Sequence, residues 1–217
     1  MTDFAARRTM MVDTQVRPSD VTKFPIIEAM LAIPREVYVG ADQLQTAYLG
    51  ENLEIAPGRV ILEPRNFSKM LEAVDVQPGD TVLDLGCGFG YSTAVVARLA
   101  HAVVAVETDA AMAKDAQARL SAEGVDNAAV TTAPLQQGAA KHGPFDVILI
   151  QGAVETVPDS LLDQLRIGGR IAAIFMEGRL GVARIGLKGA NGVNWRYAFN
   201  ASAPVLQGFR KEAAFTL

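Results

Sequence analysis

Three glycines at alternate positions, directly after a short apolar segment, constrain the fold of this chain more than any other feature. The segment Thr81–Leu85 has the length and composition of a buried strand, and a helical pattern follows from about Ser92 to Leu99. Between them lies Gly-Cys-Gly-Phe-Gly-Tyr, residues 86–91. Glycines in such a turn permit positive φ angles and let a ligand approach the main chain. The pattern predicts a strand, a turn and a helix, with a ligand site at the carboxyl end of the strand.

The alternation of strand and helix patterns continues along residues 76–217. Further strands are predicted at His101–Glu107, Ala128–Thr132, Phe145–Gln151 and Arg170–Phe175, and further helices at Ala110–Glu123 and Asp159–Leu165. Gly181–Lys188 and Val193–Phe199 flank a hairpin signal, and Gly208–Thr216 is a candidate for a last strand. The expected fold is α/β, a doubly wound, mostly parallel sheet with an antiparallel C-terminal edge.

The first 75 residues follow a different, largely helical pattern. Apolar side chains between Ile26 and Ile33 have helix-like spacing, and Pro34 interrupts it. We expect residues 1–75 to form a helical N-terminal cap on the core of residues 76–217. A linker rich in glycine, serine or proline is missing between the two parts, so residues 1–217 are expected to form a single domain.

Composition narrows the function classes. The 217 residues carry a formal net charge of -4, which offers no global field for nucleic acid or an anionic membrane surface. The sequence has neither an apolar run of about 18 residues nor a basic-then-apolar leader, so we expect a cytoplasmic protein. With one cysteine, Cys87, and two histidines, we expect neither an internal disulfide nor a metal site.

The acid that ends the second predicted strand indicates the kind of ligand. Glu107 lies 21 residues beyond Gly86, at a strand end where a carboxylate can accept hydrogen bonds from both hydroxyls of a ribose. One alternative is that the glycines only make a tight turn and Glu107 is a solvated strand end. Another is a dinucleotide, whose sites prefer G-x-G-x-x-G, but the spacing here is G-x-G-x-G. The pattern favours S-adenosylmethionine, with Asp84 available to the ammonium group of this methyl donor.

Several segments outside the glycine turn resemble the protein-L-isoaspartate O-methyltransferase family. The resemblance rests on residues 11–18 and 29–39, on Ala47-Tyr48 and residues 53–58, on residues 143–150, and on the pattern P-x-x-L-x-x-Q-L-x-x-G-G-R, which ends at Arg170. It implies a Rossmann-like methyltransferase fold, S-adenosylmethionine as cofactor with S-adenosylhomocysteine as product, and a role in protein repair. The implied partner is a carboxylate of a peptide or protein.

Three positions depart from that family's pattern. Leu62 stands where the family has a serine at the methyl-transfer site, so no catalytic residue is assigned. Ala133-Pro134-Leu135 replaces Gly-Asp-Gly, and we expect Leu135 and main-chain groups to hold the adenine. Gln151-Gly152-Ala153 replaces a Thr-Ala-Ala phrase at the end of the fourth strand, where we expect Gln151 and Gly152 to form the wall that faces residues 59–64.

Two hypotheses follow from the pattern and the resemblance. In the first the chain is an O-methyltransferase acting on isoaspartyl peptides or a related acceptor; in the second it is an adenosyl-binding homologue with another small-molecule acceptor or no catalysis. The sequence leaves the oligomeric state open. The residues expected to contact the donor are Asp84, Gly86, Cys87, Gly88, Tyr91, Glu107, Thr108, Leu135 and Gln151.

Overall fold

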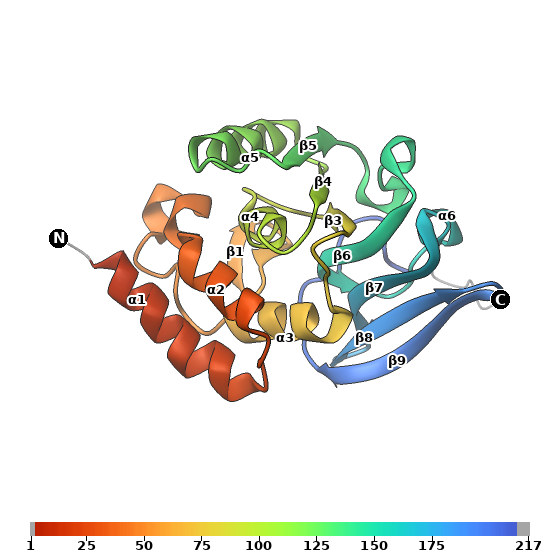
Figure 1. Ribbon diagram of the computed structural model, residues 1–217, viewed down its shortest axis with the longest axis horizontal. Coiled ribbons are helices and arrows are strands. Elements are labelled where there is room, and N and C mark those ends of the chain that lie inside the picture. Colours follow the sequence, from red (N-terminus) through yellow and green to blue (C-terminus); the bar gives the residue numbers. More distant parts are fainter. Residues whose placement is uncertain (1–2, 212–217) are drawn as a thin grey trace, which may run out of the picture.

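The N-terminal third of the computed structural model, which describes residues 3–211, is a cap of short helices (Figure 1). Its α-helices are α1 (Phe4–Met11), α2 (Phe24–Ala32) and α3 (Pro64–Val74). The Asp3 carboxylate begins α1 by accepting the Ala6 N–H at 2.9 Å, and Pro64 occupies the first turn of α3. Shorter helical turns, one of π type and the rest 3₁₀, lie at Val12–Val16, Arg17–Ser19, Arg35–Tyr38 and Ala41–Gln43. The predicted helical cap is confirmed.

The cap also contains a small hairpin that the sequence reasoning missed. Strand β1 (Leu53–Ala56) pairs antiparallel with β2 (Arg59–Ile61) through the turn Pro57-Gly58. Strands of four and three residues are too short to show an apolar alternation, so the pattern could not reveal them. This hairpin carries the residues that cover the glycine turn.

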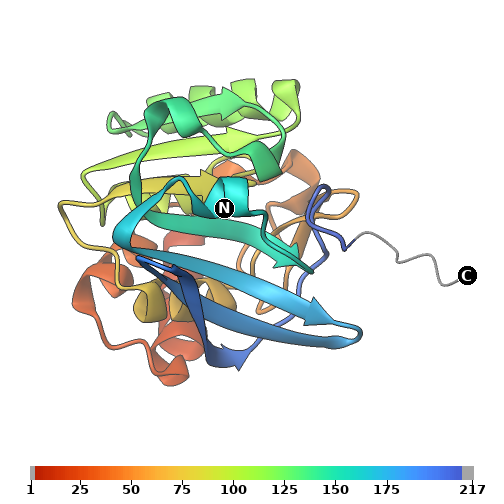
Figure 2. The ribbon, with the colours of Figure 1, turned by 90° about the vertical axis from the view of Figure 1, so that its right-hand side faces the viewer.

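The core is a seven-stranded sheet with the order β5-β4-β3-β6-β7-β8-β9 (Figure 2). The strands are β3 (Thr81–Leu85), β4 (Ala102–Glu107), β5 (Ala128–Thr132), β6 (Phe145–Val154), β7 (Leu165–Glu177), β8 (Leu180–Gly189) and β9 (Gly192–Asn200). The pairs from β5 to β7 are parallel, whereas β8 runs antiparallel to both of its neighbours. The predicted mostly parallel sheet with an antiparallel edge is confirmed, and the glycine turn follows β3, where the strand order reverses.

Alternate residues of the buried strands face the two sides of the sheet. Val82 and Val147 belong to a core that they share with the cap, including its helix α3, and with α4 (Tyr91–Ala97). Leu83 and Ile148 belong to a core on the opposite face. The opposite face is covered by α6 (Asp159–Leu162), a 3₁₀ turn at Leu135–Gln137 and part of the segment 201–209. Helix α5 (Ala110–Ala122) packs beside β4 and β5.

Three predicted boundaries were wrong by three residues or more. The helix expected over Asp159–Leu165 ends at Leu162, and β7 begins at Leu165. Gly168-Gly169 lies inside β7, where the register shifts between Leu165 and Arg170 so that extra residues bulge from the strand. Strand β6 extends to Val154, beyond the predicted end at Gln151.

The predicted last strand lies partly outside the described residues. Residues 208–211 are not in a strand, and residues 212–216 are not described. Near this segment, Val205 instead forms an isolated parallel bridge with Ala153 of β6.

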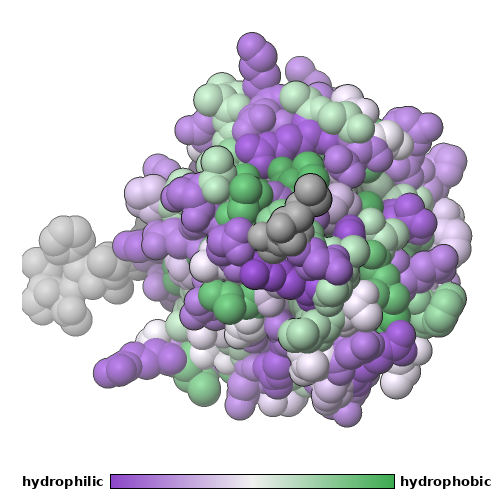
Figure 3. All heavy atoms as spheres, turned by 90° about the vertical axis from the view of Figure 1, so that its left-hand side faces the viewer, coloured by the Kyte–Doolittle hydropathy of each residue, from purple (hydrophilic) through white to green (hydrophobic). Residues whose placement is uncertain are grey.

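Figure 3 shows the face of the molecule on which the cap lies. In Figure 3 hydrophobic residues form small groups separated by hydrophilic ones. Within residues 3–211, the structure contains no helix both long and apolar enough to cross a bilayer. The same part of the chain holds no group of three or more His, Cys, Asp or Glu residues that could bind a metal ion.

Candidate functional site

The glycine turn depends on positive φ angles. Gly86 and Gly88 have φ angles of 82° and 58°, a region that side chains disfavour. The Gly86 N–H donates to the Val106 carbonyl at 2.8 Å, which ties the turn to β4. A Cβ atom on Gly88 would lie 2.5 Å from Cδ1 of Ile55, because the β1–β2 hairpin packs on the turn. The turn is thus a narrow cradle between the sheet and the hairpin.

Asp84, at the end of β3, is fully buried and fixes this cradle. Its Oδ2 accepts hydrogen bonds at 2.7 Å from the hydroxyls of Ser92 and Thr93 at the start of α4. Its Oδ1 accepts the side-chain amide of Gln151 on β6 at 2.8 Å. Burial raises the pKa of Asp84, and the three hydrogen bonds oppose that rise. One carboxylate therefore joins β3, α4 and β6 at the ligand end of the sheet.

Glu107 is the corresponding carboxylate at the end of β4, and it too is buried. Its Oε2 accepts the Gly88 N–H at 2.9 Å, and its Oε1 accepts the N–H groups of Thr108 at 2.8 Å and Asp109 at 3.3 Å. The Arg59 guanidinium, from the start of β2, forms a bidentate ion pair with both oxygens at 2.6 Å. Sequence reasoning selected Glu107 but missed this pairing.

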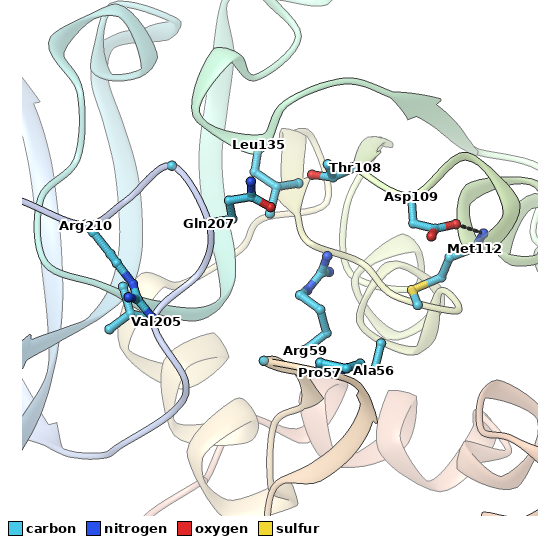
Figure 4. A pocket seen from close by; sticks show the side chains of 12 residues that line it. Ala56, Pro57, Arg59, Thr108, Asp109, Met112, Leu135, Val205, Gln207 and Arg210 are labelled. Atoms are coloured by element: carbon cyan, nitrogen blue, oxygen red, sulfur yellow. Dashed lines mark hydrogen bonds between the residues drawn. The ribbon is translucent and has the colours of Figure 1, made fainter.

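A cleft of about 870 Å³ is lined by Arg59, the ion-pair partner of Glu107, and by Thr108, the residue that follows Glu107 (Figure 4). The Arg59 side chain projects from the hairpin into the cleft. Thr108 and Leu135 lie on the far side, Met112 on one flank, and Arg210 on the other. The volume falls within the range of about 300–1,000 Å³ that is typical of small-molecule sites. An apolar wall at Leu135 next to buried polar groups suits a nucleoside.

A second, nearly filled cavity of about 10 Å³ lies against the glycine turn. Leu62, Phe67, Tyr91 and Gln151 are among its lining residues. Leu62 is 2% exposed, so the hydrocarbon side chain fills the space next to the turn. Residues 60–62, which follow the hairpin turn, and Gly86 of the glycine turn line this cavity from different parts of the chain.

Arg35 holds the loop that carries Leu62. Its Nη2 donates to the Leu62 carbonyl at 3.0 Å, and its Nε donates to the Ala47 carbonyl at 2.7 Å. The guanidinium lies 4.7 Å from the centroid of the Tyr91 ring, and burial lowers the pKa of Arg35. The two hydrogen bonds therefore hold the Leu62 segment within the cap, and the contact with Tyr91 joins this part of the cap to α4.

Comparison with known proteins identifies the family of this chain. The sequence model of the family described as Protein-L-isoaspartate(D-aspartate) O-methyltransferase (PCMT) matches residues 7–183. The chain belongs to this family. It is 39% identical over 171 residues to the protein-L-isoaspartate O-methyltransferase of Koribacter versatilis, covering 79% of this chain and 77% of that relative. It is 37% identical over 169 residues to the Methylorubrum extorquens protein of the same name, covering 78% and 74%.

Solved structures of PCMT proteins share the fold. A protein-L-isoaspartate O-methyltransferase aligns with a TM-score of 0.83 at 24% identity, covering 93% of this chain and 66% of that one. A Plasmodium falciparum PCMT in complex with S-adenosyl-L-homocysteine aligns with a TM-score of 0.79 at 18% identity, covering 95% and 99%. As a PCMT family member, this chain is an S-adenosylmethionine-dependent O-methyltransferase with a Rossmann-like fold.

The nine residues predicted to contact the methyl donor lie together at one end of the sheet. Gly86, Cys87, Tyr91 and Gln151 line the small cavity, whereas Thr108 and Leu135 line the large cleft. Gly88 is hydrogen-bonded to Glu107, and Asp84 is hydrogen-bonded to Gln151. Their roles as donor ligands stay predictions.

Cys87 fits the role of a packed side chain better than that of a nucleophile. It is 4% exposed, and burial raises the pKa of its thiol well above the usual value. The thiol therefore stays protonated at neutral pH.

Three charged residues, Arg59, Glu63 and Arg65, lie between the start of β2 and the first turn of α3. Arg59 enters the site through Glu107, whereas the Arg65 side chain is half exposed and lies 4.0 Å from the Glu63 carboxylate. Burial raises the pKa of Glu63. Only Arg59 of these three lines the large cleft.

Sequence reasoning also missed the partners of Asp84. Ser92 and Thr93 follow the turn directly, and a strand–turn–helix unit returns the first helical turn to the strand end. Hydroxyls at these two positions were a usable signal. Gln207 and Arg210 on the cleft wall gave no such signal, because they come from an irregular C-terminal segment.

Proposed function

We propose that this PCMT family member transfers a methyl group to a carboxylate of a peptide or protein acceptor, with the donor held between Glu107 and the glycine turn. The observation that carries the proposal is the buried Glu107 carboxylate, which is hydrogen-bonded to Gly88 at 2.9 Å and lies beside a nucleoside-sized cleft. S-adenosylmethionine supplies an activated methyl group on a sulfonium when it is bound. A small-molecule acceptor is the alternative.

The residues around the cleft fit an adenosyl ligand. Glu107 can accept hydrogen bonds from ribose hydroxyls, and Leu135 offers an apolar surface to the base. Asp84 offers a carboxylate to the donor's ammonium group when it is ionised, and the glycine turn leaves main-chain groups close to the ligand. Gln151 holds the Asp84 carboxylate in place from β6.

The reaction needs alignment more than acid–base chemistry. A peptide carboxylate has a pKa near 4 and is already an anion at neutral pH, so no base has to activate it. Holding two reactants in line in a site without water supplies much of the acceleration. Residues 60–62 and Arg35 would act by covering the reacting groups and excluding water. His101 directly precedes the amino end of β4 and His142 lies three residues before that of β6, and neither residue lines the cleft.

Methyl transfer to a peptide tests the proposal. Purified protein is incubated with methyl-labelled S-adenosylmethionine and an isoaspartyl peptide, with the matching aspartyl peptide as control. We expect base-labile label in the isoaspartyl peptide, since a methyl ester hydrolyses in base. Label no higher than the control would contradict the proposed acceptor, and label in neither peptide together with methylation of a small carboxylic acid would support the alternative.

A Leu62→Ser variant tests the acceptor side of the site. If a polar group of the acceptor faces this position, a hydroxyl restores a hydrogen bond whose loss costs about 1–3 kcal/mol. We expect the kcat/KM for the isoaspartyl peptide to rise about tenfold. Leu62→Ala is the control, because it opens the same space without a hydroxyl. Equal effects of the two variants would contradict a polar contact at position 62.

A further inference from the structure

The Arg59–Glu107 ion pair occupies the group that the donor is proposed to use. Arg59 Nη1 and Nη2 each lie 2.6 Å from one oxygen of Glu107. The side chain of Arg59 is 15% exposed and that of Glu107 is 0% exposed. A guanidinium with two parallel N–H donors offers the carboxylate the same fork that two neighbouring hydroxyls would offer.

Glu107 has no room for Arg59 and a ribose together. Three main-chain N–H groups, those of Gly88, Thr108 and Asp109, already take part of its acceptor capacity. A carboxylate has about four lone-pair sites, and the two N–H groups of Arg59 take those that the three main-chain N–H groups leave. The hydroxyls of a ribose can reach both oxygens only where Arg59 withdraws.

Arg59 is placed so that it can withdraw. It follows the hairpin turn at Gly58, where an added Cβ would meet no atom within 4 Å among the described residues. Both Gly58 and Arg59 line the large cleft, so the guanidinium has a solvated space beside it. The buried Nε of Arg59 lacks a hydrogen-bond partner within residues 3–211. That group loses nothing when the side chain moves.

We propose that Arg59 is a positioning residue that competes with the donor's ribose for Glu107, so that donor binding exchanges a guanidinium for a diol. This inference rests on the proposed placement of the donor. The exchange makes the site selective, because a ligand must replace two strong hydrogen bonds to enter. It also connects donor binding to the β1–β2 hairpin, which carries Arg59 and packs Ile55 on Gly88.

Calorimetry with S-adenosylhomocysteine tests the exchange through the sign of the effect. Arg59→Ala removes the competitor, so we expect S-adenosylhomocysteine to bind about tenfold more tightly than to the wild-type protein. Arg59→Lys, which keeps the charge but cannot form the bidentate fork, is expected to bind with intermediate affinity. Thermal unfolding of each variant checks that it is folded. If Arg59→Ala does not fold, the affinity of Arg59→Lys tests the exchange in its place.

Arg166→Ala is the matched control. It removes an arginine from another buried carboxylate, Asp146, at 2.5 Å near the opposite end of the sheet, and we expect its affinity to equal that of the wild type. Wild-type binding with unchanged or weaker binding by both Arg59 variants would overturn the exchange and leave the donor site standing. Absence of binding by the wild type and all variants would overturn the proposed donor site itself.

Discussion

At the scale of single residues, Asp84 combines a structural role, as a buried hydrogen-bond acceptor, with a proposed role in donor binding. It is fully buried, and three side-chain donors from α4 and β6 surround it. Neutral partners of this kind could be satisfied by an amide as well as by an anion. Because burial raises the pKa of Asp84, ionisation of this group opposes folding at neutral pH. A carboxyl group that costs stability at this buried place points to a role in ligand binding.

Asp84→Asn separates the two demands. The unfolded state ionises near pH 4 and the folded state at a higher pH, so the wild type loses stability as pH rises through that interval. We expect Asp84→Asn to be at least as stable as the wild type at pH 7, with the difference disappearing near pH 3. S-adenosylhomocysteine should bind about tenfold more weakly, because its ammonium loses an anionic partner.

Thermal unfolding at the two pH values and calorimetry measure both effects. A variant that unfolds several degrees earlier at pH 7 but binds the ligand normally would show that the charge of Asp84 is structural.

Residues at strand ends were predictable, whereas those that reach the site from the hairpin were not. Asp84 and Glu107 end apolar runs, and parallel strands bring such ends together. Arg59 meets Glu107 from 48 positions away in the chain, and its direction depends on a hairpin without sequence periodicity. For a charged residue in an irregular segment, the sequence does not indicate with which residue it pairs.

At the scale of elements, β3 lies where its apolar run predicted, at Thr81–Leu85, and β5, a partly exposed edge strand, also has its predicted limits, Ala128–Thr132. Buried parallel strands read as continuous apolar runs between turn signals, which makes their limits visible. The start of β7 was not visible, because Gly168-Gly169 indicates a turn and the structure absorbs both glycines into a bulge. Tertiary pairing decided that boundary.

Arg119 on α5 fastens the cap to the core. Its Nη1 donates to the carbonyls of Val37 at 2.7 Å and Val39 at 2.9 Å, and its guanidinium lies 4.4 Å from the Phe89 ring centroid. We expect Arg119→Met to lower the free energy of unfolding by about 1.5–3 kcal/mol, because hydrogen bonds from a charged group to the main chain are lost. Urea denaturation measures the change.

The control is Arg17→Met. Arg17 and Arg119 each pair with an aspartate four residues earlier in the sequence, but the Arg17 pair with Asp13 is half exposed and lies outside the cap–core contact. Exposed pairs of this kind contribute roughly 0.3–0.5 kcal/mol. Equal losses in the two variants would contradict a fastening role for Arg119.

At the scale of the whole molecule, the sheet order brings the carboxyl ends of β3, β4 and β6 together at one end of the sheet, and the cap covers that end. A single hydrophobic core runs from Met11 and Met30 in the cap to Val147 in β6. The cap is thus folded onto the sheet, and its hairpin reaches Glu107 and Gly88. The fold class could be predicted from alternating patterns, but the covering of the site by the hairpin depends on packing between distant segments.

The proposed placement of the donor depends most directly on Glu107. Calorimetry of S-adenosylhomocysteine binding to the wild type, Glu107→Ala and the control Glu177→Ala tests it. Glu177 also pairs with an arginine, Arg184, but in an exposed part of β7. We predict that Glu107→Ala weakens binding at least about tenfold, because the ribose loses its charged acceptor. Unchanged affinity in a folded Glu107→Ala protein would contradict the placement of the donor.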